Sequence, residues 1–83
     1  MNDLMFEVKD EYGNIKQYEM LLSFNNNFIN YIVYTDNTYN TNNELNIFAS
    51  RYEIIDNKIN LKDLEDVKEY ELVNKKILEF ISR

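Results

Sequence analysis

The sequence predicts an α+β fold, an antiparallel β-meander of four to five strands packed with one C-terminal α-helix. Short apolar and aromatic stretches alternate with polar residues at a period of two, as half-buried strands do. Clusters of Asn, Asp and Gly separate these stretches, as turns separate consecutive strands. Beyond Asp66 the apolar period changes to that of a helix. Because the chain has 83 residues, we expect one small domain, residues 1–83.

The first two expected strands form a hairpin. Residues 4–10, LMFEVKD, make the first strand, and Gly13 supplies the positive φ of a tight turn. Residues 15–24 alternate most clearly, and we expect one face to carry four apolar side chains: Tyr18, Met20, Leu22 and Phe24. Three Asn at residues 25–27 predict the next turn, because Asn tolerates a left-handed backbone.

The third and fourth expected strands, residues 28–36 and 45–54, are rich in β-branched and aromatic side chains. On the third strand, one face is expected to carry Ile29, Tyr31 and Val33, and the other Ile32 and Tyr34. On the fourth, one face carries Leu45, Ile47 and Ala49, and the other Phe48 and Tyr52. After a turn at residues 55–58, residues 59–64 either add a short fifth strand or lead into the helix.

The C-terminal segment predicts one helix from about Val67 to Ile81. Its apolar residues recur at helical spacing: Tyr70, Val73, Ile77 and Phe80 or Ile81. Asp66 suits the N-cap, and Glu69 three residues later completes a pattern like the capping box. A small sheet with an apolar face needs a cover, and this helix is the segment that we expect to provide it.

Composition excludes several kinds of chemistry. The chain has no Cys and no His, so it lacks a thiolate, an imidazole base and an imidazole metal ligand. A single Gly does not build a phosphate-binding loop. Neighbouring acids such as Glu65 and Asp66 fit a capping cluster better than an acid–base pair, which needs two carboxylates across a cleft. We therefore expect no enzyme, no catalytic residue, no cofactor and no small-molecule substrate.

The negative charge argues against polyanionic partners. The formal net charge is −6, from 9 basic and 15 acidic residues, and residues 1–60 hold −5 of it, from 4 basic and 9 acidic residues. Such a surface repels nucleic-acid phosphates and anionic membranes. No apolar run approaches the ~20 residues of a membrane span. The segment MNDLMFEVKDE lacks the basic and apolar regions of a signal peptide, so we expect a cytoplasmic protein.

The segment DNTYNTNNE, residues 36–44, has oxygen-bearing side chains at nearly every position. A calcium loop of the EF-hand type starting at Asp36 would take its next ligands from Thr38, Asn40 and Glu44. It would also need Gly in place of Thr41 and Glu in place of Ile47, and helices in place of the flanking strands. We therefore expect no dedicated metal site but a solvated connection whose side chains bind nearby backbone groups. Weak ion binding by this segment is the alternative.

Four aromatic residues on the third and fourth strands form the candidate interaction surface: Tyr31, Tyr34, Phe48 and Tyr52. Proteins that stack nucleic-acid bases on such residues add Lys and Arg for the phosphates, and only Arg51 is basic here. Both faces of these strands carry apolar side chains, and one helix covers one face. The uncovered face favours a protein partner or self-association, with a homodimer as the simplest form.

Four segments resemble, in this order and spacing, the domain of unknown function 1292 family, the YrzB-like small bacterial proteins: EYGNIKQYEMLLSF, YIVYTDN, LNIFASRYE and LEDVKEYELV. The resemblance covers residues 6–80. The chain departs from the family pattern at Asn43, near a frequent Gly, and at Tyr70, where Trp is usual. The resemblance implies a small, acidic, cytosolic bacterial protein, and it implies no activity because the family has none assigned.

These observations predict a non-enzymatic protein-interaction or self-associating module. The alternative is an acidic decoy that occupies the nucleic-acid-binding site of another protein. That alternative follows from the negative charge of residues 1–60.

Overall fold

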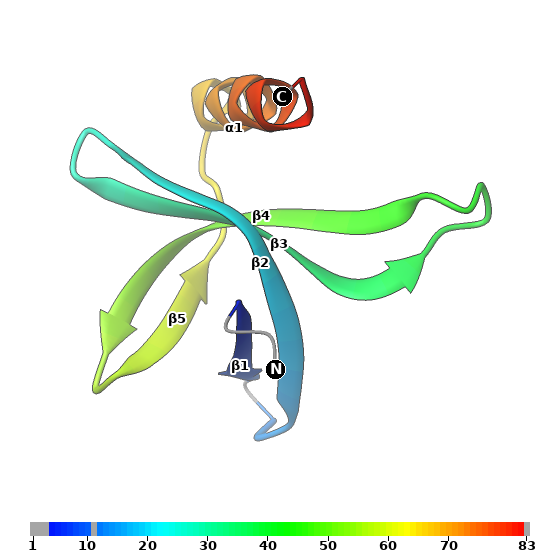
Figure 1. Ribbon diagram of the computed structural model, residues 1–83. Helices are drawn as coiled ribbons and strands as arrows, with labels where there is room; N and C mark the ends of the chain where they lie inside the picture. Colours follow the sequence, from blue (N-terminus) through cyan, green and yellow to red (C-terminus); the bar gives the residue numbers. More distant parts are fainter. Residues whose placement is uncertain (1–3, 11, 83) are drawn as a thin grey trace.

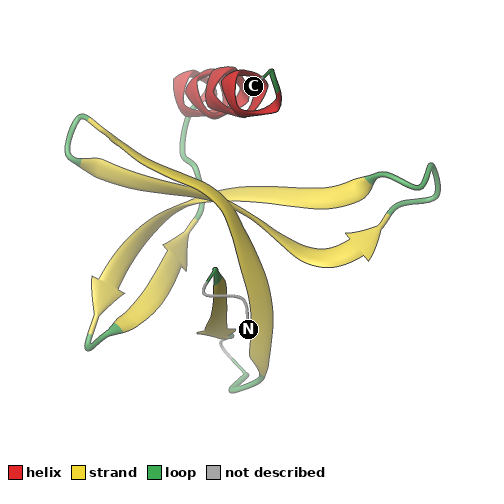
Figure 2. Cartoon of the chain, in the orientation of Figure 1, coloured by secondary structure: helices red, strands yellow, loops and turns green. Residues whose placement is uncertain are grey.

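The computed structural model describes residues 4–10 and 12–82 (Figures 1 and 2). Its elements follow in chain order: β1 (Met5–Lys9), β2 (Ile15–Asn26), β3 (Ile29–Tyr39), β4 (Leu45–Ile55), β5 (Lys58–Lys62) and α1 (Val67–Ile81). Each strand pairs antiparallel with the next, which gives one five-stranded meander. The predicted α+β class, the antiparallel meander and the C-terminal helix are confirmed. Residues 58–62 form a fifth strand rather than only a lead into the helix.

The sheet curls strongly. β1 and β5 lie at opposite ends of the strand order, yet they contact each other. Since every neighbouring pair is antiparallel, these two edge strands run in the same direction. The sheet therefore curls towards a barrel, with a seam between β1 and β5.

A β-bulge in β2 exchanges the two faces of that strand. Met20 pairs with Tyr34, but Leu22 pairs with the adjacent Val33, so Leu21 is an extra residue. Directly opposed residues share a face of a sheet, which places Met20 with Tyr34 and Leu22 with Val33 on opposite faces. The prediction that Tyr18, Met20, Leu22 and Phe24 share one face is therefore wrong. The first two lie on one face and the last two on the other.

The main core lies between β3 and the C-terminal segment. Four buried side chains form its centre: Tyr31, Val33, Leu64 and Val73. Partly buried apolar residues surround them: Leu21, Leu22, Phe24, Ile29, Ala49, Leu72 and Ile77. As predicted, Tyr31 and Val33 share this face, whereas Tyr34 lies opposite Phe48 on the other face.

Two hairpins use two-residue turns with left-handed backbone. Asn27 and Phe28 join β2 to β3 with φ of 52° and 66°, and Asp56 and Asn57 join β4 to β5 with φ of 52° and 64°. Positive φ at both central residues is the type I′ pattern, whose twist matches that of the flanking strands. The predicted positive φ of Gly13 is also found, at 84°. Phe28 is unexpected among these turn residues, because bulky residues rarely adopt a left-handed backbone conformation.

Candidate functional site

The four aromatic residues expected to form an interaction surface lie in different environments. Tyr31 is 2% exposed and faces the core with Val73, and Tyr34 is 8% exposed on the opposite face. Phe48 is 40% exposed and Tyr52 is half-buried. The structure therefore does not gather the four side chains into one surface, because β3 points Tyr31 and Tyr34 in opposite directions.

The face that carries Tyr34 is filled by other aromatic rings. The centroid of the Tyr34 ring lies 4.9 Å from that of Tyr18, 5.8 Å from that of Phe6 and 5.7 Å from that of Phe48. The Tyr34 and Ser50 hydroxyls share a hydrogen bond of 2.9 Å, and burial raises the pKa of Tyr34. The sheet thus covers much of its second face by curling, which a flat sheet with one helix does not do.

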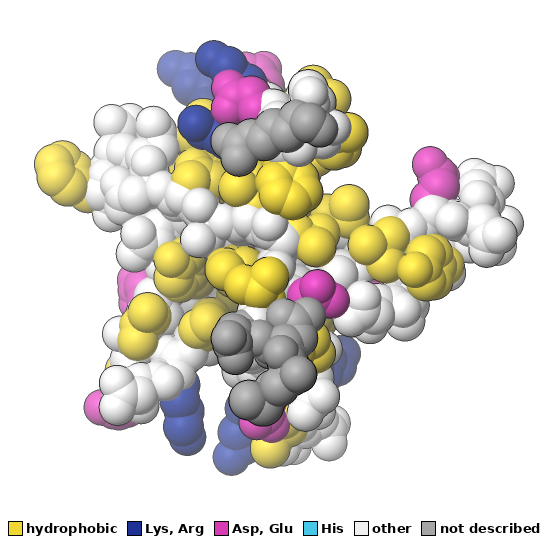
Figure 3. Space-filling view, in the orientation of Figure 1, with side chains coloured by type: hydrophobic (Ala, Val, Ile, Leu, Met, Phe, Trp, Pro, Cys, Tyr) yellow, Lys and Arg dark blue, Asp and Glu magenta, His cyan; other side chains and the backbone are white. Residues whose placement is uncertain are grey.

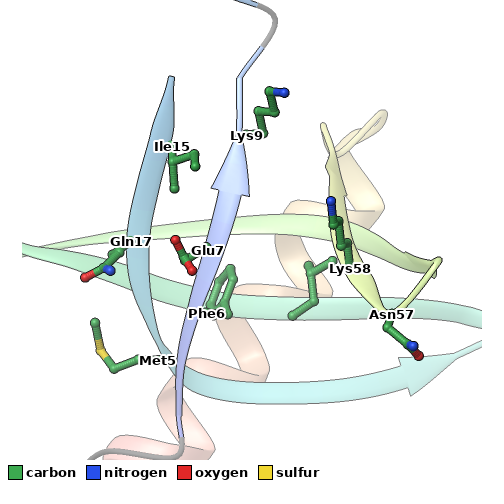
Figure 4. Close-up of a pocket in the computed structure, with 9 residues that line it drawn as sticks. Met5, Phe6, Glu7, Lys9, Ile15, Gln17, Asn57 and Lys58 are labelled. Carbon is green, nitrogen blue, oxygen red and sulfur yellow. The ribbon is translucent and has the colours of Figure 1, made fainter. Parts of the chain in front are cut away.

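A pocket of about 690 Å³ opens at the seam between β1 and β5 (Figure 4). Its lining mixes apolar and charged side chains: Met5, Phe6, Glu7, Lys9, Ile15, Gln17, Asn57, Lys58 and Ile59. Apart from Phe6 and Ile59, these side chains are exposed. The charged side chains of Glu7, Lys9 and Lys58 are exposed, and this lining supplies no nucleophile with an adjacent base.

A buried ionic group connects the start of α1 to the sheet. The Glu69 carboxylate accepts hydrogen bonds of 2.6 Å from the Tyr31 hydroxyl and 2.6 Å from Arg51 Nε. Its other oxygen accepts the Glu65 backbone N–H at 2.7 Å, while Asp66 caps the helix by accepting the Glu69 N–H at 3.0 Å. The helix start is thereby tied to both β3 and β4.

Electrostatics keep this group in one protonation state. The Arg51 guanidinium, with the Tyr31 hydroxyl, lowers the pKa of Glu69 to about 2 although burial acts in the opposite direction. Burial, with the neighbouring Glu69 carboxylate, raises the pKa of Tyr31 to about 12. Near neutral pH the carboxylate is charged and the phenol is protonated. The group has the character of a structural anchor, since its charge and donors are matched within the chain.

Side chains of residues 36–44 bind nearby backbone groups, as predicted, although residues 36–39 continue β3 and only residues 40–44 connect it to β4. Asp36 Oδ1 accepts the Thr38 N–H at 3.0 Å. Asn40 Oδ1 accepts the N–H groups of Asn42 at 2.8 Å and Glu44 at 3.0 Å. Within residues 4–10 and 12–82, no three acidic side chains gather in a way that would hold a metal ion.

The expected apolar stripe of α1 divides into two. Val73 is buried and Ile77 half-buried against the core, whereas Tyr70 and Ile81 are exposed. Four large apolar side chains on the outer side of the helix, which we name the α1 stripe, are 56–70% exposed: Val67, Tyr70, Leu78 and Ile81. Hydrophobic, basic and acidic side chains lie together on the helix at the top of the space-filling view (Figure 3).

The sequence pattern did not reveal the anchor, and it did not separate the α1 stripe from the residues of α1 that face the core. Glu69 bonds to residues 18 and 38 positions away, a separation that no local pattern reveals. The α1 stripe was visible as apolar residues at helical spacing on a second side of the helix. The side of α1 that faces the sheet includes the buried Glu69 carboxylate. Because charged residues are seldom buried, the sequence does not indicate this orientation of the helix.

Among the described residues, no helix is long and apolar enough to cross a membrane. Comparison with protein-family models, curated proteins and solved structures gives no match. The resemblance to the domain of unknown function 1292 family therefore stays a prediction.

Proposed function

We propose that this protein is a non-enzymatic protein-interaction module that binds through the α1 stripe. The observation that carries the proposal is the exposure of its four apolar side chains on one side of a 15-residue helix. At about 100° per residue, their positions fall within an arc of about 80°. Contiguous exposed apolar surface of this kind marks interaction sites.

The inner side of α1 and one aromatic cluster of the sheet are already covered within the chain. Glu69 and Val73, on the inner side of α1, are buried at 6% and 3% exposure, so that side is already occupied. Four aromatic rings of the sheet pack on one another: Phe6, Tyr18, Tyr34 and Phe48. The outer side of α1 therefore combines large apolar side chains with a rigid backbone, as helix-in-groove recognition requires.

The test compares two baits that differ only in where one Ile is replaced. Ile81 lies in the α1 stripe and Ile54 lies on β4, and both are 66% exposed. Ile81→Lys and Ile54→Lys therefore add the same charge and remove the same exposed side chain. We expect proteins captured from the host by the wild-type chain to be lost with Ile81→Lys and retained with Ile54→Lys. An identical set of captured proteins for both variants would contradict the proposal.

The acidic decoy stays a second prediction. Part of the negative charge is matched within the chain, because four acids lie within 4 Å of Arg or Lys nitrogens: Glu53, Glu65, Glu69 and Glu79. Replacement of exposed acids such as Glu7 and Glu44 by Lys should lower the affinity for a basic partner and reduce the salt dependence of its binding. Unchanged binding and salt dependence would remove this alternative.

A further inference from the structure

We infer that the α1 stripe binds the α1 stripe of a second copy, with the two helices antiparallel about a two-fold axis near Asn74. The inference rests on the proposed function and names the partner of the same site. A two-fold interface brings one surface patch onto itself, so each residue must suit the residue that the symmetry places opposite it.

The apolar residues of α1 meet this requirement. Tyr70 and Leu78 each lie four positions from Asn74, and Val67 and Ile81 each lie seven positions from it. An antiparallel pair centred there sets Tyr70 against the second Leu78 and Val67 against the second Ile81. Every exposed apolar side chain of the α1 stripe then meets another one.

Asn74 itself occupies the axis. It is exposed and lies within the arc of the α1 stripe. Its amide carries both a donor and an acceptor, so two copies can hydrogen-bond to each other. A single Asn within an apolar helix seam fixes the alignment of the pair, because a shifted pairing buries the amide against apolar groups.

The charges beside the α1 stripe favour the same orientation. Glu71 and Lys75 are exposed on one flank of it. With a two-fold axis perpendicular to the helices, this flank lies beside the same flank of the second copy. The residues of the second flank then run in the opposite direction. Glu71 then lies within two residues, about 3 Å along the helix axis, of the level of the second Lys75, and Lys75 lies likewise relative to the second Glu71.

Farther out on the same flank, Lys68 and Glu79 repeat the pattern, since the reversal sets each within one residue of the level of the other. Glu79 also has a partner within its own helix, Lys76, at 3.8 Å. The order of charge along the flank (Lys68, Glu71, Lys75, Glu79) is thus complementary to its own reverse.

The interface is small. A helix of 15 residues is about 22 Å long. One side of it offers less than the roughly 800 Å² per partner of a standard protein interface. We therefore expect a weak dimer that forms with increasing concentration, and we expect its dissociation constant between about 10 μM and about 1 mM.

Sedimentation equilibrium of the full chain over this concentration range tests self-association. We expect the wild type and Ile54→Lys to dimerise alike, and Ile81→Lys, present twice in the interface, to raise the dissociation constant at least about tenfold. Circular dichroism melts establish that each variant is folded. A wild-type chain that stays monomeric up to about 1 mM would overturn the inference, and so would equal dimerisation of the two Lys variants.

Charge exchange tests the antiparallel orientation. Glu71→Lys and Lys75→Glu each place like charges together at two symmetric contacts, so each variant alone should dimerise several-fold more weakly. An equimolar mixture of the two should recover wild-type affinity as a heterodimer, detected by native mass spectrometry. The change within each helix stays the same on mixing, so recovery reports contact between copies. A mixture no tighter than the single variants would overturn the antiparallel pairing.

The two proposals fail differently. A monomeric wild type whose bait still captures another protein in an Ile81-dependent way overturns self-pairing and leaves the interaction module standing. A monomeric wild type with no Ile81-dependent capture overturns both.

Discussion

At the scale of single residues, Glu69 is the side chain whose chemistry the fold depends on most. It is 6% exposed, and its carboxylate accepts hydrogen bonds from the Tyr31 hydroxyl, Arg51 Nε and the Glu65 backbone N–H. Because the pKa of Glu69 is lowered to about 2, its charge contributes stability above the ordinary carboxyl range near 4.5. That contribution is lost as the pH falls from about 5 through about 2.

We therefore predict that Glu69→Gln lowers the free energy of unfolding by about 2 kcal/mol at pH 7 and by less at pH 3. The variant keeps the side-chain shape but leaves the Arg51 charge less well matched. Urea denaturation at the two pH values measures the difference. Glu71→Gln, on the exposed side of the helix, is the matched control and should change stability by under about 0.5 kcal/mol. An equal loss of unfolding free energy at both pH values would show that the charge of Glu69 does not cause the destabilisation.

Phe28 has a left-handed backbone conformation that its bulky side chain disfavours. Its φ is 66° and its side chain is 100% exposed, so the left-handed conformation is not offset by packing within the chain. Phe28→Gly should stabilise the protein by about 1 kcal/mol, measured as a rise in melting temperature. Phe28→Ala removes the ring and keeps the backbone strain, so it should not produce this rise. Equal effects of the two substitutions would assign the change to the ring.

At the scale of the elements, alternation and capping made the strands and the helix predictable. The bulge at Leu21 was not, because Met20, Leu21 and Leu22 are all apolar and no polar residue marks the change of face. The candidate surface was only partly predictable for a related reason. A period of two separates Tyr31 from Tyr34, but the burial of Tyr34 depends on Phe6 and Tyr18. Those rings reach it only after the sheet curls.

The helix start shows what local sequence does determine. Asp66 accepts the N–H of Glu69 at 3.0 Å, as the spacing of the two residues predicted. Asp66→Ala should lower the free energy of unfolding by about 1 kcal/mol, because it leaves backbone donors of the first turn without this acceptor. Asp66→Asn keeps an acceptor and should recover most of that loss in thermal or urea unfolding. If Asn behaved like Ala, the cap would not be the cause.

At the scale of the whole molecule, stability should decline from the centre of the sheet to its edges. Residues 31–35 of β3 are buried, and β3 pairs with strands on both sides. We predict that their amides exchange hydrogen only through global unfolding, whereas amides of β1 and β5 exchange through local opening. Native-state hydrogen exchange followed by NMR measures both classes. Protection in β1 equal to that in β3 would show that the sheet opens as one unit.

The number of strands has a consequence for the seam between β1 and β5. In a meander every strand runs opposite to the one before it. With an odd number of strands, the last strand therefore runs in the same direction as the first. An antiparallel ladder therefore cannot close this sheet, whatever side chains stand along the two edges. Parity alone excludes closure by antiparallel pairing throughout, and adding or removing one strand is the change that would allow it.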